Sequence, residues 1–370
     1  MWKPLTYTIS YKANGGSGSI ASHTVNYGSN VTISNNSFTA PTGHKFAGWT
    51  TKSDGTNDGF GWFNASTLNG WSGTWSYING QYGIADQKLV LYAMWSKKSY
   101  KLTINPKSGT WGGTTSSSSF TQEYQSTKSI APPTRPGYIF AGWYKTSYGA
   151  LNNSTATNPI MSSSSNLPMT VYNNSQDGSV TINRKSDTGA GFTYTMEITT
   201  ASPHTSKPGL GGFVTSTNAA SGASFIHVIR AKIPTGYYLS HHANSVGDNP
   251  TWEWLTIKEG TGAWHNYAYK LTCSTSGTFK NFGYVALNNS SNTVPVTWYV
   301  GGTQVTKNPT SAQTFTYGAG DTTLYAQWIP ETVEIYYNDK WSRAIPYIYN
   351  GSDWKQTIPY VYNNGWKAIQ

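Results

Sequence analysis

The chain has 370 residues, enough for about two to four domains. Only 11% of the residues are charged while 15% are aromatic, which excludes a disordered linker, since such segments lack the apolar surface to offset their ordering entropy. The net charge of +10 arises mainly because only 15 acidic residues oppose 25 dispersed Lys and Arg, so we predict no nucleic-acid partner. The alternative is a weak attraction to an anionic surface such as teichoic acid, phosphate-rich glycan or a cell wall.

Short runs of β-branched and aromatic residues, separated by Gly, Asn, Ser and Pro clusters, predict strands and turns throughout. No window of helical length has a 3.6-residue apolar period, so the fold class is all-β. The single cysteine, Cys273, excludes an intrachain disulfide and reads as a buried small hydrophobe. No run of about 18 apolar residues occurs, and we expect neither a leader segment nor insertion into a membrane.

One cassette of motifs occurs twice, the second time split open. The first copy begins with Tyr-Thr-Ile-Ser-Tyr at position 7, passes through Phe-Ala-Gly-Trp at 46–49 and closes on Leu-Tyr-Ala-Met-Trp at 91–95. The second copy has Phe-Ala-Gly-Trp at 140–143, but its closing Leu-Tyr-Ala-Gln-Trp comes only at 324–328.

The spacing between these motifs predicts the domain boundaries. From Gly-Trp to the closing Trp there are 46 residues in the first copy (49 to 95) and 185 in the second (143 to 328). The difference of 139 residues is the size of one domain. We therefore predict four parts: a first repeat domain at 1–97, a second at 98–154 and 301–329, an inserted domain at 155–300, and a tail at 330–370.

Several spaced motifs of the cassette agree in order with a known family. These are an Ala-Asn-Gly-Gly turn at 13–16, Tyr27-Gly28, the Pro-Thr…Phe-Ala-Gly-Trp run at 41–49 and its second copy at 133–143. In these motifs the chain resembles the Listeria–Bacteroides repeat, the β-grasp-like module of internalin-type surface proteins. The resemblance implies two small β-grasp-like domains in a modular chain that binds a ligand and acts as a spacer.

The tryptophans of the cassette divide into two groups. Trp49, Trp95, Trp143 and Trp328 recur at equivalent places, which favours core packing over ligand contact. The segment 60–82 is longer than in typical repeats, and its tryptophans have no equivalent in the second copy. This extra trio predicts an aromatic platform for sugar stacking or subunit contact: Trp62, Trp71 and Trp75.

The insertion shows at least six short strands between turn signals, which predicts a sandwich of jelly-roll type. It resembles the jelly-roll modules of phage tail and virion-surface proteins, a layout shared with carbohydrate-binding modules. Loops at one end of a sandwich usually carry recognition. The candidate glycan-binding residues, next to Asn266 in turn-rich sequence, are Trp252, Glu253, Trp254, Trp264 and His265. The alternative is that one or two of these tryptophans fill the core of the sandwich.

The sequence offers little for catalysis or metal binding. The densest titratable cluster includes His241 and His242, but adjacent strand residues point to opposite faces and would not share a metal ion. Glu253 with Glu259, or Glu197 with Asp187, lies in no glycosidase motif, and neither a nucleophile elbow nor a phosphate loop is present. We predict a protein that is not an enzyme, with no catalytic residue, metal or cofactor.

The tail repeats a Tyr-Asn-x-x-Trp unit that predicts serial β-hairpins. Its tryptophans are 13 and 12 residues apart (341 to 354 to 366). Forty residues bury little core alone, so the tail is expected to pair with neighbouring chains or to dock on the domain before it, and we favour a homotrimer. The candidate oligomerisation residues are Trp341, Trp354 and Trp366. Endings of this kind resemble phage structural proteins.

Together these features predict a non-enzymatic bacteriophage structural protein: a head fibre, decoration protein or tail-associated protein. It would attach to the bacterial surface, with surface glycans and other virion proteins of the capsid or tail as partners. Its place would be the virion surface, assembled in the host cytoplasm and extracellular after release. The alternative is a bacterial cell-surface adhesin of internalin-repeat type. A polysaccharide-degrading enzyme is a third reading, for which no carboxylate pair is evident.

Overall fold

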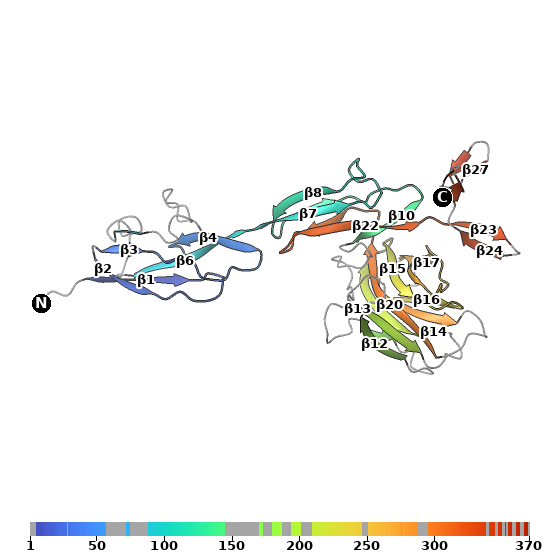
Figure 1. Ribbon diagram of the computed structural model, residues 1–370, viewed down its shortest axis with the longest axis horizontal. Helices are drawn as coiled ribbons and strands as arrows, with labels where there is room; N and C mark the ends of the chain where they lie inside the picture. Colours follow the sequence, from blue (N-terminus) through green and yellow to red (C-terminus); the bar gives the residue numbers. More distant parts are fainter. Residues whose placement is uncertain are drawn as a thin grey trace. The chain divides into compact units, whose positions relative to one another are not determined.

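A computed structural model describes residues 5–27, 29–56, 72–74, 88–144, 170–172, 180–186, 194–200, 209–245, 251–274, 276–287, 295–337, 340–344, 347–349, 352, 354–356, 360–362 and 366–368. Every regular element in these residues is a strand (Figure 1), which confirms the all-β prediction. Within the same residues no helix is long and apolar enough to cross a membrane. Two compact units are present: Met1–Leu102 with Phe120–Lys128 and Phe315–Thr322, and Thr103–Ser119 with Ser129–Thr314 and Thr323–Gln370.

The first repeat contains a four-stranded sheet in the order β2-β1-β6-β4. Its strands are β1 (Thr6–Lys12), β2 (His23–Asn26), β4 (His44–Thr50) and β6 (Lys88–Lys97), and a second pair joins β3 (Asn30–Thr32) to β5 (Ser72–Thr74). β1 lies parallel to β6 and antiparallel to β2. The alternation of Tyr7, Ile9 and Tyr11 in β1 places these three side chains in the core.

The second repeat has a sheet in the order β10-β22-β7-β8. Its strands are β7 (Ser99–Asn105), β8 (Ser118–Glu123), β10 (Tyr138–Tyr144) and β22 (Thr322–Pro330), and β9 (Thr127–Ile130) pairs with β21 (Gln313–Thr316). β10 and β22 are antiparallel, with Phe140 opposite Trp328. The motifs before and after the insertion are therefore neighbours in one sheet, while the domain boundaries themselves stay a prediction.

Both repeats share a bulge in the Phe-Ala-Gly-Trp motif. The register shifts between Phe46 and Gly48, and again between Phe140 and Gly142. Gly48 and Gly142 have φ of 136° and 127°, a conformation that glycine adopts without a Cβ clash. The tryptophans that follow them, Trp49 and Trp143, are buried in their cores, as predicted.

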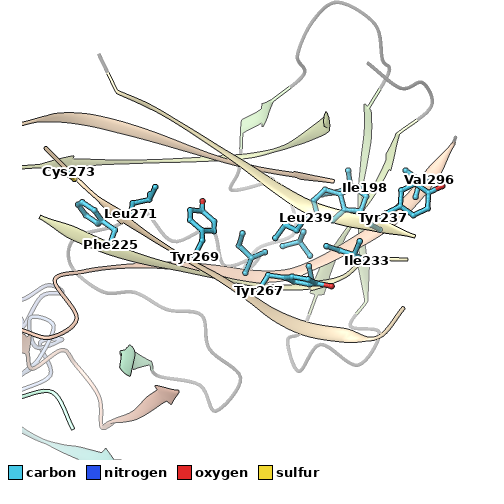
Figure 2. Packing of buried hydrophobic residues seen from close by; sticks show 14 of the residues in the cluster. Ile198, Phe225, Ile233, Tyr237, Leu239, Tyr267, Tyr269, Leu271, Cys273 and Val296 are labelled. Carbon is cyan, nitrogen blue, oxygen red and sulfur yellow. The ribbon is translucent and has the colours of Figure 1, made fainter. Parts of the chain in front are cut away.

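The insertion folds as two facing sheets. One has the order β11-β14-β19-β16, with strands β11 (Thr170–Tyr172), β14 (Gly209–Ala219), β16 (Tyr237–Ser245) and β19 (Gly277–Leu287). The other has the order β12-β13-β20-β15-β18-β17, with strands β12 (Val180–Ser186), β13 (Tyr194–Thr200), β15 (Ser224–Lys232), β17 (Thr251–Trp254), β18 (Trp264–Thr272) and β20 (Val296–Lys307). The main core contains side chains of both sheets, including Phe225, Leu239 and Tyr269 (Figure 2).

The six-stranded sheet of the insertion is covered on both faces along β15. Phe225 and Ile229 point to the inner face and join the main core. Ile226 and Val228 point to the outer face, where they pack in a second cluster. That cluster, which we call the junction cluster, combines them with further apolar residues of the insertion and the second repeat: Ile139, Ala141, Leu255, Ala268 and Ile329. The second repeat thus covers part of the outer face.

Within the residues that the structure describes, the tail forms three two-stranded hairpins, as predicted. They pair β23 (Val333–Tyr337) with β24 (Lys340–Ala344), β25 (Tyr347–Tyr349) with β26 (Trp354–Gln356), and β27 (Tyr360–Tyr362) with β28 (Trp366–Ala368). Trp341, Trp354 and Trp366 each stand opposite a tyrosine in the register. Their side chains lie outside the described residues, and their role in oligomerisation stays a prediction.

Candidate ligand-binding site

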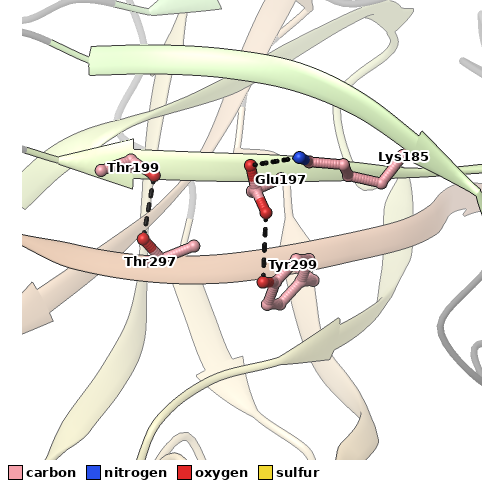
Figure 3. A network of polar contacts seen from close by, with 5 residues as sticks. All are labelled: Lys185, Glu197, Thr199, Thr297 and Tyr299. Atoms are coloured by element: carbon pink, nitrogen blue, oxygen red, sulfur yellow. Dashed lines mark hydrogen bonds and ion pairs between the residues drawn. The ribbon is translucent and has the colours of Figure 1, made fainter.

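A polar network organises the part of the outer face formed by β12, β13 and β20 (Figure 3). The Lys185 ammonium lies 3.3 Å from Glu197 Oε1, and the Tyr299 hydroxyl donates to Glu197 Oε2 at 3.2 Å. The hydroxyls of Thr199 and Thr297 are hydrogen-bonded at 2.9 Å. Because side chains alternate along a strand, these groups point away from the buried Ile198 and Trp298. The network fixes the Tyr299 ring on this face.

Trp264, the first residue of β18, lies against this ring. The two ring centroids are 6.5 Å apart with the planes tilted by 57°, and the indole is half-buried. Trp264 lines a cavity of about 600 Å³, which we call the Trp264 cavity. Its other lining residues come from β15, β18, the segment after β17 and the end of β22: Arg230, Leu255, Thr256, Ile257, His265, Asn266, Trp328, Ile329, Pro330 and Thr332.

The polar groups of the Trp264 cavity sit on two paired strands. Arg230 stands opposite Asn266 in the register of β15 and β18, and its Nη1 donates to Asn266 Oδ1 at 3.2 Å. The His265 ring contacts Tyr267 at 5.0 Å between centroids, and its buried Nε2 makes no hydrogen bond within the described residues. Burial lowers the pKa of His265, and the charge of Arg230 lowers it further, so the imidazole is neutral at neutral pH. Because side chains alternate along β18, the His265 ring lies on the side of Ala231 and Tyr267, towards the main core, so the cavity itself offers an aromatic ring, a guanidinium and an amide.

Acidification should destabilise the protein through His265. The folded chain holds the pKa of His265 below 6.5, so the unfolded chain takes up the proton at higher pH. This contribution is fully present above about pH 6.5 and is lost as the pH falls below it. Thermal unfolding measured from about pH 7.5 down to about pH 5 should show a falling Tm, and His265→Gln should reduce the slope.

The structure brings some of the predicted glycan-binding residues together and separates others. Trp264 and His265 both line the Trp264 cavity, but only Trp264 directs its side chain to the outer face, because His265 stands opposite Ala231 and contacts Tyr267 of the main core. Glu253 lies in another, where it pairs with Lys270 at 3.4 Å. Trp254 packs against the main core of the insertion, with its ring 5.3 Å from that of Tyr269, in line with the alternative that some tryptophans fill the core.

For the other predicted tryptophans the structure describes either the backbone alone or nothing. The backbone of Trp252 pairs with Leu271 in β17, but its side chain lies outside the described residues. Trp62, Trp71 and Trp75 also lie outside them.

Of the lining residues that were not among the predicted site residues, Arg230 and Trp328 matter most for the chemistry of the cavity. Arg230 interrupts the apolar run of β15, and this polar break in a buried strand is the signal that could have revealed it. Trp328 was assigned to core packing by its recurrence. It does anchor the repeat, since its Nε1 donates to the carbonyl oxygen of Pro106 at 2.9 Å, but it is only half-buried and lines the cavity as well.

The described residues contain no group of three or more His, Cys, Asp or Glu side chains placed to hold a metal ion.

Comparison with known proteins identifies similarity in two regions of the sequence. The family model of the Listeria-Bacteroides repeat domain matches residues 7–68 and 100–172. No curated protein matches the chain. One solved structure, described as "Structural basis for the promiscuous specificity of the carbohydrate-binding modules from the beta-sandwich super family", is similar at 14% identity, over 76% of this chain and 92% of that chain, with a TM-score of 0.23. A likeness at that score carries no argument about fold or ligand. The motif-based prediction is therefore confirmed in its coarse form: two regions of the chain match the Listeria-Bacteroides repeat domain.

Proposed function

We propose that this protein is a non-enzymatic structural component of the bacteriophage virion surface that attaches to glycans of the bacterial surface through the Trp264 cavity. The observation that carries the binding proposal is the Trp264 indole, held against Tyr299 beside Arg230 and Asn266 in a concave site. Sugar rings stack on aromatic faces, while guanidinium and amide groups hydrogen-bond their hydroxyls. A cavity of about 600 Å³ lies within the usual range for small-molecule sites.

The virion assignment rests on the likeness of the insertion and the tail to phage structural proteins. Other virion proteins of the capsid or tail would hold the chain on the particle. The repeats would act as stalk and spacer.

The tail supports the proposal of a homotrimer. Each described hairpin is a sheet of only two strands, and isolated hairpins of this size are marginally stable in water. Strand edges of neighbouring chains would complete them. Light scattering should give three times the chain mass of 40.4 kDa, and a mass equal to one chain would overturn the trimer.

Trp264→Ala should weaken binding to purified wall polysaccharide of the host bacterium by about 30-fold, the effect of losing an aromatic anchor. Trp264→Phe, which keeps an aromatic face, should retain most of the affinity. Calorimetric titration measures the binding, and a near-native Tm of each variant verifies the fold. Unchanged binding by a folded Trp264→Ala protein would refute the assignment of this cavity.

The second candidate function, a bacterial cell-surface adhesin, is favoured by the same repeat match. Mass spectrometry of gradient-purified particles and of the bacterial envelope separates the two. Enrichment at fixed stoichiometry with the major capsid or tail protein supports the virion role. Presence in the envelope alone would establish the adhesin instead.

A further inference from the structure

A second cavity adjoins the Trp264 cavity. Its volume is about 730 Å³, and we call it the Tyr138 cavity. It lies on the outer face of the six-stranded sheet, where Glu253 and Lys270 of the insertion approach the segment that leads into β10. The two cavities share Leu255 and Trp328. They therefore meet at the junction cluster, to which Leu255 belongs.

A third, smaller cavity of about 210 Å³ continues the series. It is lined by Thr251, Glu253, Lys270 and Thr272, and we call it the Thr251 cavity. It shares Glu253 and Lys270 with the Tyr138 cavity. The three cavities thus form a chain in which each neighbouring pair has two lining residues in common.

The three cavities follow β17, the edge strand of the sheet, and the segment after it. Thr251 and Glu253 share one face of β17, which ends at Trp254. Leu255 packs in the junction cluster beside Ala268, and the chain then bends and continues to Ile257. Thr251, Glu253, Leu255 and Ile257 line the cavities in that order, from the Thr251 cavity through the Tyr138 cavity to the Trp264 cavity. Six residue steps of extended chain span at most about 20 Å. We call this elongated depression the β17 groove.

The chemistry of the β17 groove is mixed along its length. Aromatic side chains recur in it, with Trp264 at one end and Tyr138 and Trp328 further along. Arg135 stacks on Tyr138 at 3.6 Å, which holds that ring in place. The Glu253 carboxylate and the Lys270 ammonium are about half exposed, so both retain capacity for hydroxyl groups beyond their own contact. Charges of both signs suit a hydroxyl-rich chain better than a uniformly charged polyanion.

We infer that the β17 groove binds a linear oligosaccharide of several residues, which extends from the Trp264 cavity past Leu255 and Trp328 to Glu253 and Lys270. The inference rests on the proposed glycan binding and names the form of the ligand: an extended segment of a polymer, not a single terminal sugar. The Trp264 cavity anchors one ring by stacking. Glu253 and Lys270 form a second subsite that only a longer ligand reaches.

The test is a length series of ligands. Size-fractionated fragments of wall polysaccharide from the host bacterium, from one sugar residue upwards, are titrated calorimetrically against the full chain and its variants. Affinity should rise with fragment length and then level off. Glu253→Ala should leave the shortest fragments unaffected and weaken the longest by about three- to tenfold, the loss of one hydrogen-bonding group. Trp264→Ala should weaken all lengths.

Lys12→Ala provides a control. It removes an exposed Lys side chain from β1, in the first repeat, and should change binding at no length. The ion pair between Glu253 and Lys270 lies at the surface and contributes little to stability, so both variants should fold. Failure of every fragment to bind would refute the proposed function itself. Binding that is independent of length, or a Glu253→Ala protein that binds the longest fragments like wild type, would refute the extended groove and leave glycan binding intact.

Discussion

Gly109→Ala should destabilise the second repeat and also weaken glycan binding. A Cβ at Gly109 would collide with the Trp328 ring and approach the backbone oxygen of Thr134 to 2.9 Å. Because the backbone at Thr134 cannot move, the Trp328 indole must shift in the variant. This shift strains the hydrogen bond from Trp328 Nε1 to the carbonyl oxygen of Pro106. Overpacking of this kind costs about 1–3 kcal/mol of unfolding free energy. Since Trp328 lines two cavities of the β17 groove, its displacement should also lower the affinity for long glycan fragments.

The first repeat provides the matched variant, Gly16→Ala. A Cβ at Gly16 would lie 2.6 Å from Trp95 Cζ2 and 2.7 Å from the backbone oxygen of Thr39. Trp95 Nε1 donates to the carbonyl oxygens of Ala13 and Asn14, both at 3.0 Å, so the lesion is equivalent. Calorimetric unfolding should show a comparable loss in each variant, while titration below both transitions should show weaker binding for Gly109→Ala alone. Equal binding by the two variants would remove Trp328 from the ligand site.

The largest loss of stability is expected for Val228→Asp. Val228 is 4% exposed and belongs to the junction cluster, where the second repeat covers the outer face of β15. An unpaired carboxylate buried there should cost about 3–5 kcal/mol. Because Val228 points away from the main core of the insertion, the charge should separate the repeat from the sheet before it disrupts the sandwich. Calorimetry should therefore resolve two transitions in place of a joint one.

Two further exchanges calibrate that result. Val228→Ala deletes two buried methyl groups and should lower the free energy of unfolding by about 2 kcal/mol. Lys12→Asp places a carboxylate at an exposed position of the first repeat and should cost less than about 1 kcal/mol. A Val228→Asp protein as stable as the Lys12→Asp protein would contradict the packing of the second repeat against the sheet.

Motifs that recur in order made the fold class and the repeats predictable. Each repeat has a bulge glycine, Gly48 or Gly142, at the same place in its motif. Each also has a glycine, Gly16 or Gly109, in contact with its closing tryptophan. Because both copies match the same family model and need the same residues at these places, each copy supports the strand assignment of the other. The tail hairpins could be predicted from the sequence because Asn and Gly residues mark the turn at which each strand reverses direction.

The binding site was only partly predictable, because proximity in sequence does not reveal which face of a sheet a side chain joins. Glu253 and Trp254 are adjacent on β17 and point to opposite faces, so the tryptophan enters the core while the carboxylate lines the groove. The same alternation of side chains along a strand predicts that His241 and His242 face opposite sides. Arg230 and Trp328 reach the same cavity from segments about one hundred residues apart, and their meeting depends on how the second repeat packs on β15.

The junction cluster has a consequence for how such chains can be recombined. The insertion alone, even when cut after the end of β20, would leave Ile226, Val228 and Leu255 facing water, with no apolar partner from β10 or β22. The insertion is therefore not a cassette that can be transplanted by itself into another host repeat. The unit that can be transferred is the whole stretch from β10 to β22. It contains the insertion together with the two strands of the second repeat that cover its outer face.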